Sequence, residues 1–324
     1  MKKKILVMAQ VPKAGLAELE EHFDIIYPEQ FYFTEDDLNR HIVEADGLLS
    51  VFTAPVSSEL LQLAQQLQII SNFGVGYNNI DLNYATTRGI AVCNSPDSVT
   101  EPTAEMAMGL MIALTRRISE TDRKLRSESG LKWGMMENLG HSLWGKTLGI
   151  IGMGRIGRAL ARRAVASGMK VIYYNRTRLD ASIELQYSAN LVSFNNLIQQ
   201  SDIISLHCPL TDDTHHLIGE KEIPQMKDGV FIINTSRGAV IDERALVLNL
   251  ANGKIGGAGL DVFEDEPGIS RELYLMDNVV LTPHNATGTI ETRIATAREA
   301  AENLTRFFDG RRDISIVNPS VWKT

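Results

Sequence analysis

The stretch Thr147–Arg178, TLGIIGMGRIGRALARRAVASGMKVIYYNRTR, decides the fold. It predicts a strand, a glycine turn, a helix and a second strand within about 30 residues, which is the βαβ unit of dinucleotide-binding domains. Gly152 would allow the tight turn, Gly154 would let the backbone approach a pyrophosphate, and Gly157 would let helix and strand pack closely. The N-terminus of the helix would face the phosphates. The stretch therefore predicts a dinucleotide site.

The second strand of this unit is not followed by the usual acid. An acidic residue about 20 positions after the glycines normally holds the ribose 2′-hydroxyl of NAD. Here the sequence has Asn175, Arg176, Thr177 and Arg178 instead. Arginine donates a charge-assisted fork of hydrogen bonds to phosphate, so we predict NADP(H) as the preferred cofactor, with NAD(H) possible. Two alternatives are a solvated turn and a ribose held by Asp180, if the turn folds back.

Strands and helices alternate through the rest of the chain. Before the glycine turn, KILVM, FDIIYP, DGLLSVF, LQIISNFG and IAVCNS predict strands, and helical patterns lie between them. A long helix is expected from about Thr100 to about Arg126, and a last helix begins near Thr289. Such alternation is typical of parallel sheets covered by helices, and 324 residues are enough for two domains. We predict an α/β protein with two doubly wound parallel-sheet domains.

Composition and charge exclude several classes of protein. A net charge of −8 without a long basic block argues against a nucleic-acid or anionic-membrane surface. The apolar run at residues 106–114 is far below the roughly 18 residues of a membrane span. Residues 5–9 predict a first strand, since they are too short for a signal peptide. Cys93 and Cys208 could pair, but two cysteines in a chain of this length favour the cytoplasm.

Three late strands end in reactive side chains. VFIINTSRG ends in Arg237, GGAGLDVFEDEP passes Asp261 and ends near Glu266, and NVVLTPH ends in His284. Ligands of open α/β sheets bind outside the carboxyl ends of the strands. Arginine clamps carboxylates, histidine carries a proton near neutral pH, and a carboxylate would orient its ring. A turn arginine, a loop carboxylate and a core histidine are the alternative interpretations, because spacing does not show that the three meet.

Seven motifs in order resemble the D-isomer-specific 2-hydroxyacid dehydrogenase family over nearly the whole chain, most closely its glyoxylate/hydroxypyruvate and 2-ketogluconate reductases. They are FGVGYNNID, PTAEMAMGLMIAL, LGIIGMGRIGRALARRA, LHCPLTDDTHHLI, FIINTSRGAVIDERAL, GAGLDVFEDEP and VVLTPHNATGT. The resemblance implies reduction of a small 2-keto acid such as glyoxylate, hydroxypyruvate or 2-ketogluconate to the D-2-hydroxy acid. It implies a flavodoxin-like substrate domain of residues 1–99 and 286–324, with a Rossmann-type cofactor domain of residues 100–285 inserted into it. It also implies a homodimer, with LKWGM in the dimer loop.

The resemblance also assigns roles to residues. His284 would give a proton to the keto oxygen, Glu266 would keep His284 charged, and Arg237 would bind the substrate carboxylate. The amides of Val75 and Gly76 would hold the same carboxylate. The cofactor residues implied by the βαβ unit and the family together are Thr103, Gly152, Gly154, Arg155, Ile156, Gly157, Asn175, Arg176, Thr177, Arg178, Cys208, Pro209, Thr214, Thr235 and Asp261.

The family pattern is not matched everywhere, and other functions stay open. Asn78 stands where the family usually has Asp, and PHNATG replaces the usual PHxGS. His207, His215 and His216 match no ligand position of the family, so no metal is expected. The alternatives are an NAD-dependent enzyme such as a 3-phosphoglycerate dehydrogenase, and a non-enzymatic co-repressor-like NAD(P) sensor. A methyltransferase would not explain Arg237 and His284.

Overall fold

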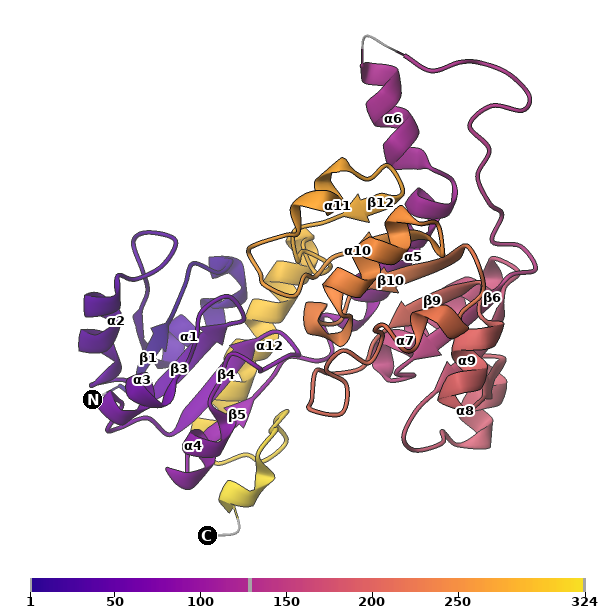
Figure 1. Cartoon of the computed structure of the whole chain (residues 1–324). Coiled ribbons are helices and arrows are strands. Elements are labelled where there is room, and N and C mark those ends of the chain that lie inside the picture. Colours follow the sequence, from indigo (N-terminus) through magenta and orange to yellow (C-terminus); the bar gives the residue numbers. More distant parts are fainter. Residues whose placement is uncertain (1, 128–129, 323–324) are drawn as a thin grey trace. The chain divides into compact units, whose positions relative to one another are not determined.

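The computed structural model describes residues 2–127 and 130–322, and its internal contacts divide them into two units (Figure 1). Unit 1 consists of residues 2–99 and 287–322, and unit 2 of residues 100–127 and 130–286. The second unit is thus inserted into the first along the chain. Within the described residues no helix combines the length and apolar composition that crossing a bilayer requires.

Unit 1 is built on a five-stranded sheet in the order β2-β1-β3-β4-β5. Its neighbouring strands all pair in parallel, which is the flavodoxin-like strand order. The strands are β1 (Lys4–Val7), β2 (Asp24–Ile26), β3 (Gly47–Val51), β4 (Ile69–Phe73) and β5 (Ala91–Cys93). The helices are η1 (Lys13–Gly15), α1 (Ala17–His22), α2 (Glu35–Ile42), α3 (Ser58–Leu63), α4 (Leu82–Thr87), α12 (Ile290–Phe308) and η4 (Pro319–Trp322).

Unit 2 is built on a seven-stranded sheet in the order β12-β11-β10-β9-β6-β7-β8. Its parallel pairs follow the Rossmann order, extended by one strand. The strands are β6 (Thr147–Ile151), β7 (Lys170–Tyr174), β8 (Ala189–Leu191), β9 (Ile203–Leu206), β10 (Val230–Asn234), β11 (Ile255–Leu260) and β12 (Val279–Leu281). The helices are α5 (Thr100–Thr115), α6 (Ile118–Arg126), α7 (Arg155–Ala166), α8 (Ala181–Gln186), α9 (Phe194–Gln200), η2 (Ile223–Gln225), η3 (Gly238–Val240), α10 (Glu243–Ala251) and α11 (Arg271–Leu275).

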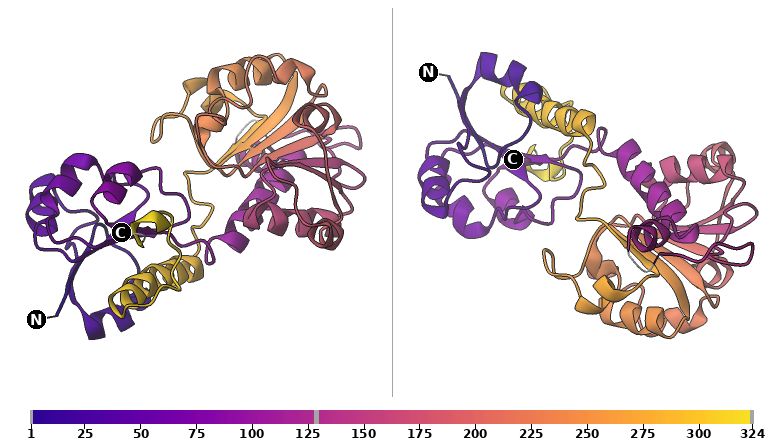
Figure 2. Two further views of the ribbon diagram at one scale, coloured as in Figure 1. Left: turned by 90° about the horizontal axis from the view of Figure 1, so that it is seen from below. Right: turned by 90° about the horizontal axis from the view of Figure 1, so that it is seen from above.

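Both sheets are covered by helices on both faces (Figure 2). In unit 2, α5 and α7 supply the apolar side chains on one face, and α9 and α10 those on the other. In unit 1, α1 and α12 cover one face, and α2, α3 and α4 the other. Because neither face meets water, the central strands are nearly continuous apolar runs instead of alternating ones. The predicted fold class is confirmed.

One predicted helix was wrong, and one strand was missed. The helix expected from Thr100 to Arg126 is broken into α5 and α6, because Arg117 adopts a left-handed φ of 56° that interrupts a right-handed helix. The Arg117 side chain donates to the Glu120 carboxylate and to the Leu139 carbonyl, and these bonds hold the break in place. The three-residue edge strand β8 was not predicted, since its sequence Ala-Asn-Leu is too short to show a period.

Candidate active site and cofactor site

The glycine turn of unit 2 joins β6 to α7 and has the geometry that its sequence predicts. Gly152 has a φ of +96°, and a Cβ there would lie 2.6 Å from the Cys208 nitrogen, so only glycine fits. A Cβ on Gly157 would lie 2.5 Å from the Gly152 carbonyl oxygen, which explains the close packing of helix and strand. At Gly154, the N-cap of α7, an added Cβ would meet no atom within 4 Å. The turn is therefore tight at two glycines and open at the third, where the helix begins with Arg155 and Ile156.

The end of β7 differs in detail from the simplest phosphate pocket. Asn175 accepts a hydrogen bond from the Met153 amide at 2.7 Å, so it braces the glycine turn. Arg176 and Thr177 are exposed, and among the described residues Arg176 has no ionic partner. Arg178, by contrast, is paired with Glu184 of α8 at 2.8 Å. The two arginines that the sequence treats alike are thus in different environments.

Glu184 was not predicted as part of this region. Its carboxylate accepts hydrogen bonds from Arg178 and from the hydroxyl of buried Tyr173, and that hydroxyl also accepts from the Leu179 amide. The pairing with Arg178, followed by the bond from Tyr173, lowers the pKa of Glu184. Burial raises the pKa of Tyr173, which stays protonated and able to donate. These contacts attach the turn after β7 to α8.

Several other predicted cofactor residues lie after β9 and β10 and in α5. Cys208 follows β9 and is half-buried, and burial raises the pKa of its thiol to about 11. Thr214 donates to the Pro209 carbonyl at 2.6 Å and so closes the loop after β9. Thr103 is buried in α5. Thr235 is also buried, and its hydroxyl has no hydrogen-bond partner among the described residues.

His207 and Cys93 were also considered from the sequence. Burial lowers the pKa of His207 to about 4, so its ring is neutral, and Nε2 lies 2.8 Å from the Ser205 hydroxyl. Cys93 and Cys208 are both free thiols, so the considered disulfide is absent between these two described residues. Nδ1 of His207 is buried without a hydrogen-bond partner among the described residues, and Cys93 is buried in unit 1.

The strands that deliver Arg237, Asp261 and His284 are neighbours. They are β10, β11 and β12, which pair in that order, and their carboxyl ends lie at one edge of the sheet. A Cβ on Gly238 would overlap the Phe263 carbonyl, so the backbone after Arg237 packs directly on the loop after β11. Strand order thus brings Arg237 and His284 to the same edge of the sheet, although they are 47 positions apart in the sequence.

His284 and Glu266 are joined by a hydrogen bond. Nδ1 of His284 lies 2.7 Å from Oε2 of Glu266, and the side chains are only 29% and 33% exposed. Oε1 of Glu266 accepts from the Phe263 amide at 2.9 Å. Burial would raise the pKa of Glu266, but these hydrogen bonds, with the charges of His284 and Arg237, lower it. Glu266 is therefore an anion over the whole neutral range, and it orients the ring.

Asp261 positions the histidine. Its buried carboxylate accepts from the Thr282 hydroxyl at 2.6 Å and from the amides of Asn285 and Ala286 at 2.9 and 2.8 Å. Its carbonyl accepts from the His284 amide at 2.8 Å. Burial raises the pKa of Asp261 although these bonds oppose the shift. The turn that carries His284, at a left-handed φ of 49°, is thus tied to the end of β11.

Arg237 is held by a small polar network that the sequence did not reveal. Oδ1 of Asn234 accepts from the amide and hydroxyl of Ser236, and Nδ2 of Asn234 donates to the Arg237 carbonyl at 2.9 Å. Burial lowers the pKa of Arg237, and the charge of Glu266 opposes that shift. A polar asparagine ending an apolar strand was the available signal. The result is a partly buried cation close enough to Glu266 to interact with it.

Val75 and Gly76 lie in unit 1, in the loop after β4. The Asn94 side chain donates to the Val75 carbonyl at 2.8 Å, and the Asn72 side chain donates to the Gly76 carbonyl at 2.8 Å. Both carbonyls of the loop are therefore fixed by side-chain amides. The role expected for the Val75 and Gly76 amides in binding a carboxylate stays a prediction.

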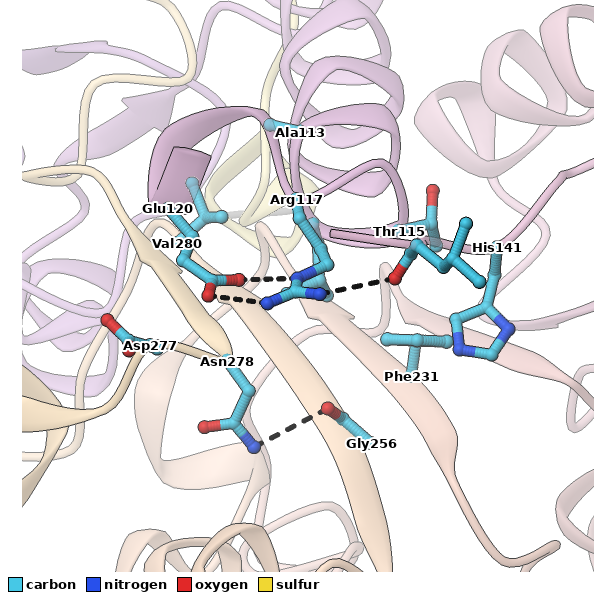
Figure 3. A pocket seen from close by; sticks show the side chains of 12 residues that line it. Ala113, Thr115, Arg117, Glu120, His141, Phe231, Gly256, Asp277, Asn278 and Val280 are labelled. Carbon is cyan, nitrogen blue, oxygen red and sulfur yellow. Dashed lines mark hydrogen bonds and ion pairs between the residues drawn. The ribbon is translucent and has the colours of Figure 1, made fainter. Parts of the chain in front are cut away.

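A cavity of about 260 Å³ lies elsewhere in unit 2 (Figure 3). It is lined by residues that begin β10, β11 and β12, among them Phe231, Gly256 and Val280, and by Arg117 and Glu120. It is therefore at the opposite ends of the strands from His284. Since ligands of such sheets bind at the carboxyl ends, we do not assign this cavity to the candidate site.

Known proteins resemble the chain over its full length. Residues 108–286 match the family model of the D-isomer specific 2-hydroxyacid dehydrogenase NAD binding domain. A glyoxylate reductase of Thermococcus litoralis is 44% identical over 99% of this chain and 98% of its own. The chain belongs to the D-isomer-specific 2-hydroxyacid dehydrogenase family. As a member of this family it is an NAD(P)-dependent oxidoreductase, and the predictions of family and enzyme class are confirmed.

Solved structures of the family resemble it closely as well. A glyoxylate reductase from Paecilomyes thermophila matches with a TM-score of 0.89 and 34% identity, over 98% of this chain and 99% of that one. An NADPH-dependent glyoxylate/hydroxypyruvate reductase from Sinorhizobium meliloti, in complex with NADP and malonate, matches with a TM-score of 0.84 and 30% identity, over 98% and 97%.

Glu120 provides a test of the electrostatics around the cavity. Its side chain is 7% exposed and accepts from Arg117 and Lys124 at 2.7 and 2.6 Å. The hydrogen bond from Arg117 is the largest cause that lowers the pKa of Glu120, and the bond from Lys124 adds to it. Burial opposes this shift. A lowered carboxyl pKa contributes stability that is present above the unfolded value of about 4.3 and is lost as the pH falls through the folded value.

We therefore expect Glu120→Gln to reduce the free energy of unfolding at pH 7 by about 1–3 kcal/mol, because charge-assisted hydrogen bonds are lost. Near pH 3 the difference from the parent protein should shrink. Urea unfolding at both pH values measures it, with Asp122→Asn, in an exposed pair on the same helix, as a control of little effect. An equal loss at both pH values would contradict the assigned ionisation of Glu120.

Proposed function

We propose that the protein reduces a small 2-keto acid, of the glyoxylate, hydroxypyruvate or 2-ketogluconate type, to the D-2-hydroxy acid, with NADPH as preferred reductant. The observation that carries the proposal is the pair of His284 and Glu266 at 2.7 Å beside Arg237, in a member of a 2-hydroxyacid dehydrogenase family. The names of glyoxylate reductase relatives support the substrate class.

His284 is the proposed proton donor. Its Nδ1 is engaged by Glu266, so the proton for the keto oxygen would come from the other ring nitrogen, Nε2. The anionic partner stabilises the charged imidazolium and fixes the ring orientation. Because Phe263 holds the second oxygen of Glu266, the pair resists rotation as the proton moves.

Arg237 is the proposed ligand of the substrate carboxylate. A guanidinium offers two parallel hydrogen bonds to a carboxylate, and partial burial strengthens the attraction between the charges. The Asn234 network fixes the backbone that carries Arg237, so the guanidinium is presented with little loss of conformational freedom. Substrate acids of different size would share this recognition of the carboxylate.

The residues around the glycine turn suit a nicotinamide dinucleotide. Gly154 has open space where a Cβ would be, and the helix α7 begins at the next residue, so a pyrophosphate would lie at the N-terminus of this helix. The buried Thr235 hydroxyl, without a partner among the described residues, is available to hydrogen-bond a bound group. When bound, the cofactor supplies the hydride.

The preference for NADPH rests on the turn after β7. Asn175 stands where an NAD-dependent enzyme would place its acid, and it braces the glycine turn. Arg176 and Thr177 are exposed and would hold the 2′-phosphate, and Arg178, oriented by Glu184, would add its charge. A carboxylate at Asn175 would repel that phosphate.

We also propose a homodimer. The loop after α6 exposes large apolar side chains, with Trp133 89%, Met135 96% and Met136 81% exposed. A patch of this kind is costly to leave in water and is typical of a protein interface. A second copy of the chain is the proposed occupant.

Replacing His284 tests the reaction. We expect His284→Asn to lower kcat for glyoxylate about 10²- to 10⁴-fold, because the proton donor is lost, while the affinity for NADPH changes little. NADPH oxidation and NADPH binding by fluorescence measure the two quantities. A variant that loses NADPH affinity instead would contradict the proton-donor role.

The same assay, run on the parent protein with glyoxylate, hydroxypyruvate, 2-ketogluconate and phosphohydroxypyruvate, separates the alternatives. Turnover mainly of phosphohydroxypyruvate with NADH would favour the 3-phosphoglycerate dehydrogenase reading. No turnover of any 2-keto acid would favour a co-repressor-like sensor.

Replacing the arginines tests the cofactor preference. We expect Arg176→Ala to weaken NADPH binding about 10- to 100-fold and NADH binding hardly at all, since only NADPH carries the 2′-phosphate. Arg178→Ala should act in the same direction but less, because Glu184 already neutralises that charge. Kd values for both cofactors measure this, with exposed Arg162→Ala as a charge-matched control. An equal loss of affinity for NADPH and NADH would mean that the arginines do not bind the 2′-phosphate and are ordinary surface charges.

A further inference from the structure

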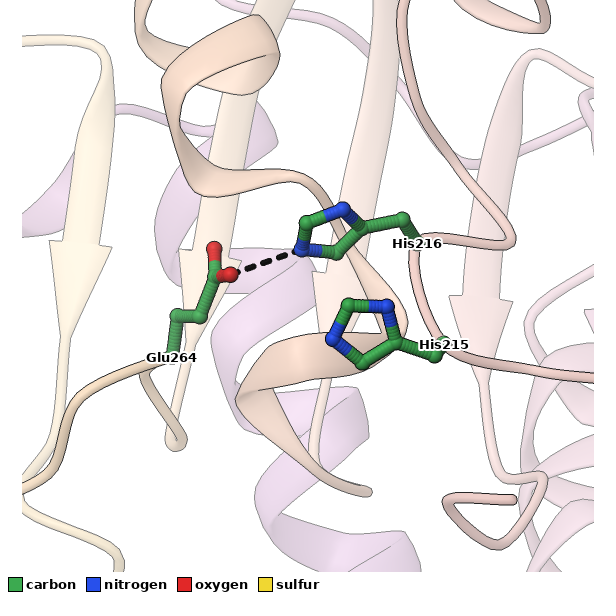
Figure 4. Close-up of side chains that lie close together, drawn as sticks. All are labelled: His215, His216 and Glu264. Carbon is green, nitrogen blue, oxygen red and sulfur yellow. Dashed lines mark hydrogen bonds and ion pairs between the residues drawn. The ribbon is translucent and has the colours of Figure 1, made fainter. Parts of the chain in front are cut away.

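His215, His216 and Glu264 form a cluster of metal-ligating groups outside the proposed active site (Figure 4). One nitrogen of each ring and one oxygen of the carboxylate lie within 4.8 Å of one another. The sequence shows only two adjacent histidines, which are usually surface residues. Folding adds the carboxylate, 48 positions later in the chain.

The backbone brings the two adjacent rings to the same side. Consecutive side chains of an extended chain point in opposite directions. His216 instead adopts a left-handed φ of 51°, and its amide donates to the Ala239 carbonyl. The rings therefore stack, with centroids 4.0 Å apart and planes at 29°. Figure 4 shows one nitrogen of each ring on the side of Glu264.

The carboxylate of Glu264 is already oriented. Its Oε1 lies 2.7 Å from Nε2 of His216, and its Oε2 accepts from the Glu243 amide at 3.1 Å. The Glu264 amide in turn donates to the Glu243 carboxylate at 3.1 Å. Glu243 thus holds both the side chain and the backbone of Glu264, as outer partners commonly hold metal ligands.

We propose that His215, His216 and Glu264 bind a divalent transition-metal ion of the Zn²⁺ class. Two imidazoles and one carboxylate are a usual ligand set for zinc, whereas Mg²⁺ prefers oxygen ligands. Ligand atoms around tetrahedral zinc lie about 3.3 Å apart, given bonds of about 2.0–2.1 Å. The cluster reaches this by small side-chain rotations, which are allowed because His215 is exposed and its ring has no hydrogen bond among the described residues.

Metal binding would change one contact of the Glu264 carboxylate and keep the other. The proton that Nε2 of His216 shares with Oε1 of Glu264 would pass to Nδ1 or to solvent, and both atoms would then bind the ion, while Oε2 keeps the Glu243 amide. A water molecule would complete the coordination on the exposed side. The ion would also tie the loop of residues 211–216 to the loop that carries Glu266, two positions beyond Glu264.

Zinc titration of tag-free, metal-free protein tests the proposal. We expect one Zn²⁺ per chain by competition with a chromophoric chelator, a rise in the melting temperature with Zn²⁺, and no effect of equimolar Mg²⁺. His215→Ala, His216→Asn and Glu264→Gln should each weaken the site at least about 10-fold. Asparagine tolerates the left-handed backbone at position 216, so that variant keeps the fold.

Two controls separate this cluster from other histidine–carboxylate pairs. His41→Gln removes the ring of a His–Glu pair that lacks a second histidine, and His284→Asn removes the ring of the proposed active site. Both should retain zinc affinity. The proposal is overturned if the parent protein binds no Zn²⁺, if the three cluster variants bind as the parent does, or if His284→Asn alone loses the ion.

Discussion

The buried carboxylate of Asp261 fixes the end of β12 to the end of β11, and the proposed chemistry depends on that attachment. It collects hydrogen bonds from Thr282, Asn285 and Ala286, the residues on either side of His284. The histidine is therefore carried by a turn with a fixed backbone instead of a mobile loop. Its pairing with Glu266 then needs only a side-chain rotamer, and the pair is preorganised before any substrate binds.

Strand order supplies the rest of the arrangement. Parallel strands place all their carboxyl ends at one edge, and β10, β11 and β12 are neighbours there. Arg237 thus meets the loop of Glu266 through the close approach at Gly238, where a side chain would overlap the Phe263 carbonyl. The same edge carries the glycine turn of β6 two strands away, across β9. One sheet edge therefore serves the proposed cofactor and the proposed acid–base pair.

The sequence predicted the parts of this edge that depend on local chemistry. Gly152 and Gly157 are required by a turn and a close contact, and Arg237 and His284 end apolar strands, so each is visible in a short pattern. It did not predict what depends on folding. The sequence pattern does not show contacts between segments, such as the ion pair of Arg178 with Glu184 or the hydrogen bond of Glu264 with His216. Nor does it show a local backbone conformation such as the left-handed φ of Arg117 that breaks the helix. Strand β8 was not predicted because a strand of three residues is too short to show an alternation of apolar and polar side chains.

In the proposed reaction Glu266 orients the ring of His284 and stabilises its imidazolium, and the pH dependence of turnover measures that contribution. Glu266→Gln keeps a similar shape but removes the negative charge. The interaction between the two groups is mutual, since the charge of His284 is one of the causes that lower the pKa of Glu266. We expect the upper pH limit of kcat/KM for glyoxylate with NADPH to move to lower pH in this variant, since the protonated ring loses its anionic partner. An upper limit at the same pH as in the parent protein would contradict it.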